Sequence, residues 1–485
     1  MKLSYITRKY PIRDIRGSMD IDIKGVEHNS KKITDKNLFI AQRGFTHDGH
    51  DYIDEAIESG AVAVVQEKAL DDNESTTMIR VRDSVDALGY LAGNYYGLPW
   101  KMMKIIGITG TNGKTSVAHY IKSILNENKC SVGILGTLGA NFGDKYIDII
   151  NTTPDSLEIQ RALHKMNQKE IEYCVMEVSS HALDLKRVKY MDFHIGIFTN
   201  LSEEHLDFHK TMDNYLKSKS KLFYKTTRNN IINIDDPYGK RLMDMVKDRI
   251  PIITYGIKES AMVYASNIDY NPNFTSFDLI TPMGNRNIQL ATLGEFSVYN
   301  ALTAAACGYA LSLDLDIIKR GLENLKGIKG RLELIENHKG YNIIIDFAHT
   351  PKAVEQALKT VSSFTKGRII VVIGAGGNRD RLKRPEMGRI VGNYADLSII
   401  TSDNPRFEDP EKIINDIIDG VKMTSGKYIK IVDRKEAIEY AIKNYRAGDT
   451  ILLAGKGHEE YTIIDDRYYP FSERKIVEDI IKGIK

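Results

Sequence analysis

The stretch KIIGITGTNGKTS, residues 104–116, decides how the surrounding chain folds. An apolar run centred on Ile106 leads into a glycine-rich turn, and apolar residues then recur at helical spacing from Val117 onward. Glycines in such a strand–loop–helix unit let backbone N–H groups close around phosphate oxygens. The pattern therefore predicts a nucleoside triphosphate site, in which Lys114 reaches the terminal phosphates and the Thr115 hydroxyl binds magnesium.

The loop departs at one position from the strict phosphate-loop pattern GxxxxGK(S/T), which requires glycine at position 108. This chain has isoleucine there and a glycine one place earlier. A plain turn is the alternative, but strand, loop, Lys-Thr pair and helix follow one another in the register that phosphate binding requires. The predicted nucleotide contacts in this loop are Thr109, Gly110, Thr111, Asn112, Gly113, Lys114 and Thr115.

The length of 485 residues is enough for about three α/β domains. Residues 1–98 are predicted to form a small domain, and residues 99–327 a central domain with a mostly parallel sheet, like that of a P-loop ATPase. Its strands are expected near 131–135, 171–177, 194–199 and 229–235. In residues 328–485, the strands of IIIDFAH, IIVVIGAGG, LSIITSDNPR and ILLAGKGHE each run into a polar or glycine-rich cluster. Because ligands bind at the carboxyl ends of parallel strands, we expect these clusters to converge in a Rossmann-like domain.

The composition limits the class of protein. The chain has 67 lysines and arginines against 65 aspartates and glutamates, a formal net charge of +2, which argues against nucleic-acid binding through bulk charge. Three scattered cysteines form no CxxC pair, so neither a disulfide framework nor a zinc site is predicted. Neither a signal peptide nor a membrane-spanning apolar run is found. We expect a cytoplasmic monomer that acts on small molecules.

Two further clusters in the central domain carry groups suited to metal or substrate binding. In YCVMEVSSH, Glu177 ends a buried strand, where a carboxylate could hold magnesium beside the phosphate loop. In FTNLSEEHLDFH, polar residues that include Asn200, His205 and Asp207 follow another strand of the same sheet. A surface glutamate and a structural histidine are the alternatives, and both stay open from these residues alone.

The GTNGKT loop and both clusters resemble motifs of the Mur ligase family, ATP-dependent enzymes that extend the peptide of the bacterial cell-wall precursor. The resemblance implies that Lys219, spaced after HLDFH as in the family, is carbamylated to N6-carboxylysine, although a solvated lysine is the alternative. The implied catalytic residues are Lys114, Glu177, His205 and Lys219. The implied ligands of the cofactor Mg²⁺ are Thr115, Glu177, His205 and the carbamate of Lys219. ATP is the implied cosubstrate, and Asn300 is a further implied contact with it.

Two segments resemble the family's sites for the UDP-muramoyl-peptide substrate. NTTPDSLEIQ at 151–160 resembles the segment that holds the muramoyl peptide, and the region from His28 to Ile57 resembles, more loosely, the uridine-binding segment. Asn29 and Lys31 stand where the family more often has Asp and Arg, and Leu185 where some members have Gln. The implied contacts are Ser30, Phe45, Thr46, His47, Asn151, Thr152, Thr153, Ser179 and Arg187.

The motif DNPR at 403–406 resembles the signature of family members that add meso-diaminopimelate, whereas lysine-adding members usually lack this arginine. A planar guanidinium can bind the distal carboxylate of diaminopimelate through two parallel hydrogen bonds. An Asn-Pro turn without a ligand is the alternative. The implied diaminopimelate contacts are Arg379, Asp403, Asn404, Pro405, Arg406, Gly455 and Glu459.

The resemblance thus implies a ligase that joins meso-diaminopimelate to UDP-N-acetylmuramoyl-L-alanyl-D-glutamate through an acyl phosphate. Three alternatives stay open: the same reaction with L-lysine, a catalytically silent muropeptide-binding protein or ATP-hydrolysing sensor, and a folylpolyglutamate synthetase. The intact Lys114 and Glu177 argue against the second, and the DNPR motif and the uridine-like segment argue against the third.

Overall fold

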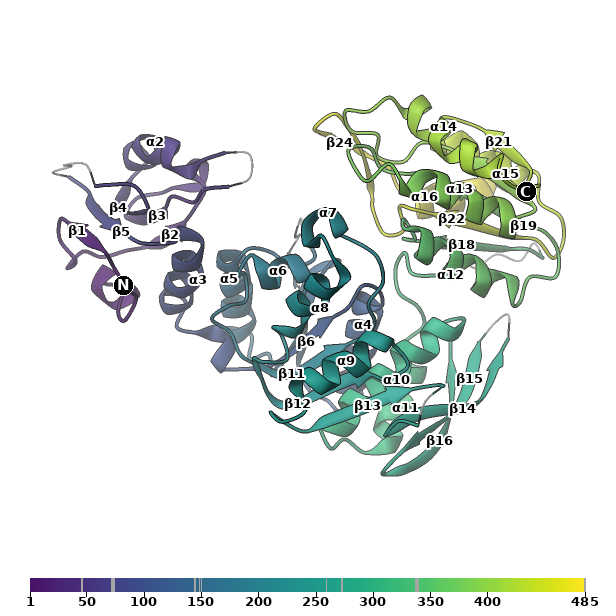
Figure 1. Ribbon diagram of the computed structural model, residues 1–485, viewed down its shortest axis with the longest axis horizontal. Coiled ribbons are helices and arrows are strands. Elements are labelled where there is room, and N and C mark those ends of the chain that lie inside the picture. Colours follow the sequence, from purple (N-terminus) through teal and green to yellow (C-terminus); the bar gives the residue numbers. More distant parts are fainter. Residues whose placement is uncertain are drawn as a thin grey trace. The chain divides into compact units, whose positions relative to one another are not determined.

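The computed structural model describes residues 1–44, 47–70, 75–143, 145–147, 149, 151–258, 260–271, 274–335 and 340–483. The chain divides into two compact units, Met1–Tyr255 and Gly256–Lys485. Figure 1 shows the order of the elements along the chain. Among the described residues, no helix combines the length and the apolar character that crossing a bilayer requires. The domain boundaries near residues 98 and 327 stay a prediction.

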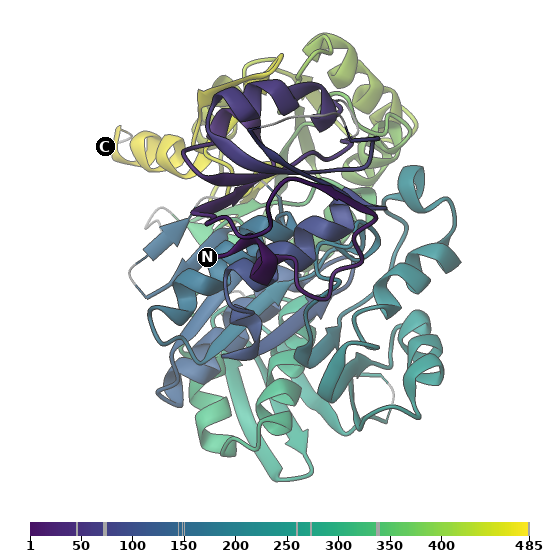
Figure 2. The same ribbon diagram turned by 90° about the vertical axis from the view of Figure 1, so that its left-hand side faces the viewer.

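The first unit begins with a five-stranded sheet in the order β1-β5-β4-β3-β2, in which only β1 is antiparallel to its neighbour. Figure 2 shows this sheet in purple, on the side that faces the viewer. The strands are β1 (Asp14–Arg16), β2 (Gly25–Glu27), β3 (Asn37–Ile40), β4 (Ala61–Gln66) and β5 (Thr77–Arg80), and the helices are α1 (Leu3–Ile6), η1 (Ser30–Lys32), η2 (Gly49–Tyr52), α2 (Ile53–Glu58), α3 (Ser84–Tyr95) and η3 (Pro99–Lys101). Leu38 of β3 packs in the cluster of α3, whereas Phe39 packs in that of α2. Helices thus cover both faces, which explains the continuous apolar strands.

The central sheet of the first unit has β6 in its middle, in the order β13-β12-β11-β6-β10-β7-β8-β9. Strands β13 to β7 are parallel, and β8 and β9 are added antiparallel. The strands are β6 (Lys104–Thr109), β7 (Val132–Gly136), β8 (Gly139–Phe142), β9 (Lys145–Ile147), β10 (Tyr173–Glu177), β11 (Phe193–Phe198), β12 (Thr226–Asn233) and β13 (Ile252–Gly256). The helices are α4 (Lys114–Glu127), α5 (Ser156–Asn167), α6 (Ser180–Asp184), α7 (Leu206–His209), α8 (Met212–Ser220) and α9 (Pro237–Val246). The four central strands expected from the sequence correspond to β7, β10, β11 and β12.

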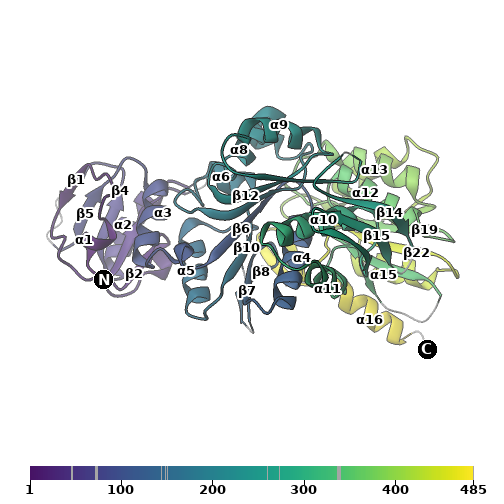
Figure 3. The ribbon, with the colours of Figure 1, turned by 90° about the horizontal axis from the view of Figure 1, so that it is seen from below.

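The register of this sheet decides which loops meet. Glu177 of β10 is paired with Ile108 of β6, and Phe198 of β11 is paired with Thr109. The carboxyl ends of β10 and β11 therefore lie on either side of the carboxyl end of β6. Figure 3 shows β6 and β10 side by side. Segments that are far apart in the sequence flank the glycine-rich loop for this reason.

The second unit begins with an antiparallel meander, β14 (Val263–Tyr270), β15 (Thr275–Thr281) and β16 (Gly284–Leu290), followed by α10 (Glu295–Ala310) and α11 (Leu315–Glu323). A six-stranded sheet follows in the order β17-β18-β22-β19-β20-β21, parallel except for β17. Its strands are β17 (Glu333–Ile335), β18 (Asn342–Asp346), β19 (Ile369–Ile373), β20 (Leu397–Ile400), β21 (Tyr428–Lys430) and β22 (Thr450–Ala454), with a separate hairpin of β23 (Tyr461–Ile464) and β24 (Arg467–Pro470).

Helices cover both faces of this second sheet. Alternate strand residues divide between two clusters: Val371 packs with the helices α12 (Pro351–Ser362), α13 (Lys383–Tyr394) and α14 (Pro410–Val421), and Val372 packs with α15 (Arg434–Lys443) and α16 (Glu473–Gly483). This is the doubly wound arrangement that the sequence predicts. The strands of the four predicted apolar segments are β18, β19, β20 and β22, which are parallel neighbours, so the clusters that follow them lie at one edge of the sheet.

Candidate active site

The glycine-rich loop closes tightly at the carboxyl end of β6. Gly110 packs so closely against the segment after β11 that an added Cβ atom would lie 1.9 Å from Thr199 Oγ1. The Lys114 side chain bends back over the loop, and its Nζ donates to Gly110 O at 2.9 Å and to Thr111 O at 2.8 Å. A lysine and a close-packed glycine loop at the start of α4 together suit a phosphate group.

The segment after β11 holds the loop in this conformation. Asn112 N donates to Asn200 Oδ1 at 3.0 Å, and Asn200 Nδ2 donates to Asn112 O at 3.1 Å. Thr111 N donates to Asn200 O at 2.8 Å, and Ser202 N donates to Thr111 Oγ1 at 3.0 Å. The Asn200 amide therefore shapes the loop, a role different from the ligand role that the sequence left open.

A carboxylate and a hydroxyl meet beside the loop. Glu177, 1% exposed, ends β10, and Thr115 Oγ1 in the first turn of α4 lies 3.0 Å from each of its carboxylate oxygens. Thr137 donates to the same carboxylate from its N at 2.9 Å and from its Oγ1 at 3.0 Å. Mg²⁺ prefers such oxygen ligands and usually needs only one or two carboxylates, with water and phosphate completing the shell. Two of the predicted magnesium ligands thus lie in direct contact.

Lys219 on α8 is 1% exposed, and its Nζ donates to Gly110 O at 3.0 Å. Burial, reinforced by the charge of Lys114, lowers the pKa of Lys219 well below its usual value. The buried side chain is directed at the phosphate loop, which excludes the alternative of a solvated surface lysine, and the lowered pKa favours its neutral amine form. An amine is a poor ligand for Mg²⁺, whereas the oxygens of a carbamate fit.

The other predicted metal ligand, His205, precedes α7 with φ +57°. Its ring lies edge-on to His181 with 4.7 Å between the centroids, and its Nε2 lies 3.8 Å from Glu204 Oε1. These contacts do not join His205 to the Thr115–Glu177 pair. Within the described ranges, no three His, Cys, Asp or Glu side chains converge as a metal site.

Four residues predicted to hold the muramoyl peptide gather beyond β10. Ser179 N donates to Thr153 Oγ1 at 3.0 Å, and Arg187 Nη1 donates to Thr153 O at 2.5 Å. Thr152 Oγ1 lies 3.1 Å from Thr137 Oγ1, within hydrogen-bond distance. Because Thr137 also donates to Glu177, these hydrogen bonds connect the predicted peptide-binding residues to the Glu177 carboxylate beside the phosphate loop.

The remaining residues predicted for this substrate lie apart from that network. Asn151 and His47 are exposed, and Phe45 and Thr46 lie outside the described residues. Ser30 is buried, and its Oγ donates to Glu55 Oε2 at 3.2 Å. His28, which follows β2 of the N-terminal sheet, contacts the segment predicted to hold the muramoyl peptide. Its Nε2 lies 3.2 Å from Oδ2 of Asp155, the N-cap residue of α5.

In the second unit, the predicted acceptor residues surround the loop after β20. Asn404 Nδ2 donates to Glu459 Oε2 at 2.8 Å. Gly455 has φ +120°, and a Cβ atom there would lie 2.7 Å from Asp403 Oδ2, so a side chain would both strain the backbone and displace the carboxylate. Arg406 Nη1 donates to Gly377 O at 3.0 Å. The loop, β22 and the segment after it thus form one polar assembly.

The Arg406 guanidinium has carbonyl oxygens as its recorded partners, Gly377 O and, at 3.5 Å, Asn404 O. Among the described residues, no carboxylate forms an ion pair with it. Burial and the exposed Arg379 lower the pKa of Arg406, whereas Glu459 and Asp403 oppose that shift. The guanidinium can therefore also bind an anionic ligand through charge-assisted hydrogen bonds.

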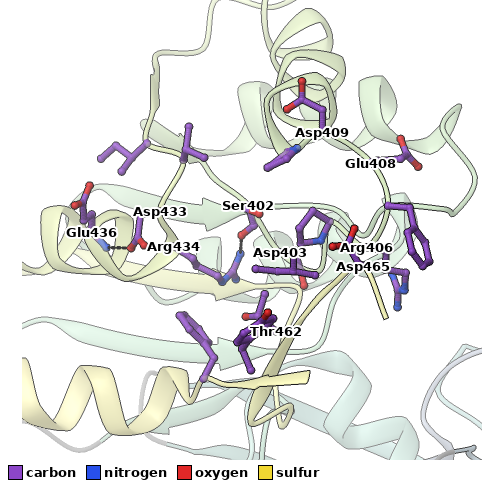
Figure 4. A pocket seen from close by; sticks show the side chains of 18 of the residues that line it. Ser402, Asp403, Arg406, Glu408, Asp409, Asp433, Arg434, Glu436, Thr462 and Asp465 are labelled. Atoms are coloured by element: carbon purple, nitrogen blue, oxygen red, sulfur yellow. Dashed lines mark hydrogen bonds between the residues drawn. The ribbon is translucent and has the colours of Figure 1, made fainter. Parts of the chain in front are cut away.

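A pocket of about 1080 Å³ opens beside this loop. Figure 4 shows Asp403 and Arg406 on one side of it, and Asp433 and Arg434 at the start of α15 on the other. Pro405 also lines the pocket, whereas Asn404, Gly455 and Glu459 do not. The predicted acceptor residues therefore divide between the wall of the pocket and the network behind it.

Family models match three parts of the chain. The Mur ligase family catalytic domain matches residues 22–96, the Mur ligase middle domain residues 108–308, and the Mur ligase glutamate ligase domain residues 330–457. The chain belongs to the Mur ligase family. It therefore has the three-domain architecture of these ligases.

Individual Mur ligases match over the full length. The chain is 45% identical over 483 residues to the UDP-N-acetylmuramoyl-L-alanyl-D-glutamate--2,6-diaminopimelate ligase of Alkaliphilus oremlandii (strain OhILAs), with 99% of both chains covered. A solved structure of a ligase with the same name is 28% identical, with a TM-score of 0.71, covering 100% of this chain and 99% of the other. The MurF ligase of Thermotoga maritima, solved in complex with ADP, has a TM-score of 0.65 over 94% of this chain and 97% of its own at 20% identity, which shows the fold.

Two polar residues of these sites were missed by the sequence analysis. Thr137 follows β7 and binds Glu177, and Lys456 is buried beneath the acceptor loop. The GKGHEE segment after β22 was a signal for Lys456, since it places a lysine at a strand end in the same sheet as DNPR. Asn300, the predicted ATP contact outside the loop, is half-buried on α10 of the second unit.

Proposed function

We propose that this Mur ligase joins meso-2,6-diaminopimelate to UDP-N-acetylmuramoyl-L-alanyl-D-glutamate, in the bacterial cytoplasm, with conversion of ATP to ADP and phosphate. The observation that carries the choice of acceptor is the Arg406 guanidinium, whose recorded partners are carbonyl oxygens. Diaminopimelate has a distal carboxylate that lysine lacks, and a guanidinium binds a carboxylate through two parallel hydrogen bonds. The names of full-length relatives support the same acceptor.

In the first half-reaction, a carboxylate oxygen of the UDP-dipeptide attacks the γ-phosphorus of ATP, and the bond to the β–γ bridging oxygen breaks. The products are an acyl phosphate and ADP. In this proposal Lys114 neutralises charge that develops on the transferred phosphoryl group, and its position on the glycine-rich loop supports that role. Mg²⁺, held by Thr115, Glu177, His205 and the modified Lys219, would supply further charge neutralisation when bound.

In this proposal Lys219 is carbamylated by carbon dioxide. A neutral amine has a free lone pair, which attacks carbon dioxide to form an N–C bond with release of one proton. Burial lowers the pKa of Lys219 and so favours this neutral form, and the product would place anionic oxygens beside Gly110. An oxygen ligand for magnesium results.

In the second half-reaction, the amine of diaminopimelate attacks the acyl carbon, and inorganic phosphate leaves after a tetrahedral intermediate. In this proposal Arg406 binds the distal carboxylate, and Glu459 accepts hydrogen bonds from the distal ammonium. Thr152, Thr153, Ser179 and Arg187 hold the muramoyl peptide.

A ligation assay with the UDP-dipeptide, MgATP and a panel of amines tests the proposal. We expect a UDP-linked peptide heavier by one diaminopimelate residue, with one ADP and one phosphate released per product. Equal or faster ligation of L-lysine would contradict the proposed acceptor. ATP hydrolysis without any gain in peptide mass would indicate a sensor and contradict the proposed reaction.

A further inference from the structure

Lys456, in the turn between β22 and β23, is the most deeply buried ammonium group near the acceptor loop, with a side chain 0% exposed. An ammonium group has three N–H donors and no acceptor. Its Nζ donates to Asn404 Oδ1 at 3.0 Å and to Tyr461 O at 2.7 Å, and Asp403 Oδ1 lies 3.5 Å away. These three oxygens match the three donors, so the ammonium is fixed in position.

This ammonium decides which way the Asn404 amide faces. Asn404 Oδ1 accepts from Lys456 Nζ and, at 3.0 Å, from Ile463 N. Both neighbours are donors only, so the opposite orientation would place an NH₂ group against them. The Nδ2 atom must therefore face Glu459, to which it donates at 2.8 Å.

The orientation of the Asn404 amide in turn determines how the Glu459 carboxylate is held. The recorded hydrogen bond uses Oε2, which also lies 3.8 Å from Lys456 Nζ, and this leaves Oε1 for a ligand. Burial and Asp403 raise the pKa of Glu459, while Asn404, Lys456 and Arg406 oppose that rise. The charged groups that face this carboxylate are Asp403, Lys456, Arg406 and Arg434. Of these, Lys456 is the cation that also holds Asn404.

We propose that Lys456 is a positioning residue for the amino-acid acceptor. It fixes the Asn404 amide so that the amide holds the Glu459 carboxylate in place for the distal ammonium of the acceptor. Lys456 does not touch the substrate itself. The inference rests on the proposed function, because it assigns Glu459 to the acceptor.

The first test replaces Lys456 with an apolar side chain of similar length, Lys456→Met, and measures kcat and KM for all three substrates. Losing a charge-assisted hydrogen bond predicts a KM for diaminopimelate about 10- to 100-fold higher. The KM values for ATP and for the UDP-dipeptide should stay within about twofold. Lys443→Met, on the exposed side of α15 and paired with Glu439, is the matched control and should behave like the native protein.

The pH profile supplies a readout that a purely structural role would not change. Without Lys456, the pKa of Glu459 rises further, so the carboxylate is protonated at higher pH. The acid limb of kcat/KM for diaminopimelate should therefore move to higher pH in Lys456→Met. An unchanged limb together with an unchanged KM for diaminopimelate would overturn the proposal.

A double-mutant cycle with Asn404→Ala tests whether Lys456 acts through this amide. The two effects on KM should overlap, so that the double variant is within about threefold of the Asn404→Ala variant. Multiplying effects would overturn the proposal. If Lys456→Met does not fold, an Asn404→Asp variant of the otherwise native protein tests the same link. An ionised aspartate side chain cannot donate a hydrogen bond to Glu459. This variant should therefore show the same rise in the KM for diaminopimelate and the same shift in the acid limb of kcat/KM. An Asn404→Asp protein with native values would likewise overturn it.

These outcomes are distinguishable from failure of the proposed function. A native protein that ligates no diaminopimelate contradicts the function itself. A native protein that ligates it, with a folded Lys456→Met variant of native KM and pH profile, contradicts only the role of Lys456.

Discussion

Replacing Arg406 by alanine should convert a diaminopimelate-selective ligase into a weak, unselective one. The loop itself should survive, because its backbone is held independently of the side chain: Arg406 N donates to Ile463 O at 3.1 Å, and Asp465 N donates to Arg406 O at 2.9 Å. Arg406 has φ +51°, and alanine meets nearly the same backbone strain as arginine there. The substitution therefore isolates the guanidinium.

The size of the effect follows from the hydrogen bonds that would be lost. In the structure, Nη1 bonds to Gly377 O, which leaves the other guanidinium donors of Arg406 for a carboxylate. Two charge-assisted hydrogen bonds at about 1.5 kcal/mol each give about 3 kcal/mol. That corresponds to a roughly 100-fold loss of kcat/KM for diaminopimelate. For L-lysine, which has no distal carboxylate, the change should stay within about threefold.

The assay is steady-state ligation with both amines on three proteins: native, Arg406→Ala and Arg381→Ala. Arg381 is the matched control, because its guanidinium is 70% exposed, pairs with Glu408 at 3.1 Å and is not itself among the residues that line the pocket. An exposed ion pair contributes about 0–1 kcal/mol, so this variant should keep native selectivity. Parallel losses for both amines in Arg406→Ala, or a native preference for lysine, would refute the reasoning.

Three further predictions concern other parts of the chain. Gly110→Ala should abolish ligation and lower the melting temperature, because its Cβ atom would lie 1.9 Å from Thr199 Oγ1; retained nucleotide binding in a calorimetric titration would contradict this. Lys219→Ala should remove most ligation, and added short carboxylates should partly restore it by supplying an oxygen ligand, whereas full activity without them would exclude the carbamate role. Glu408→Gln should destabilise the second unit by about 1–3 kcal/mol, because it weakens the bonds to the buried Arg384. The pKa of Glu408 falls from 4.5 to about 2 on folding, so the unfolded chain binds more protons in this window; native stability should therefore fall as pH drops from 4.5 toward 2, with a smaller fall for the variant in acid-denaturation curves.

The parts of the fold that the sequence predicted are those coded locally. The run IIGI, the glycine turn and the helical spacing after Lys114 are contiguous, so β6, the loop and α4 could be placed from one segment. The same holds for the four strand-end clusters of the second unit. The sequence did not predict the division between Tyr255 and Gly256, because compactness depends on contacts between distant residues.

Side-chain partners across long sequence separations were the main omission. Arg434 Nε donates to Glu473 Oε1 at 2.8 Å, and Arg434 Nη2 donates to Ala454 O at 2.8 Å, and both partners come from other elements. No spacing rule relates residues 39 positions apart. The burial of Lys219 and Lys456 could not be predicted for the same reason. Lysine is mostly exposed in proteins, so a lysine in a sequence is expected at the surface until its packing is known.

The two buried lysines show how similar burial can serve different chemistry. Each is removed from water, and burial lowers the pKa of each. Lys456 has Asp403 and Glu459 within ion-pair distance, and these opposing charges favour its charged form. Lys219 has Lys114 as a neighbouring cation and a carbonyl oxygen as its hydrogen-bond partner; Glu204 opposes the loss of its proton, but burial and Lys114 outweigh it and lower the pKa of Lys219. One lysine is therefore suited to hold neighbouring polar groups in position, and the other to react with an electrophile through its free amine.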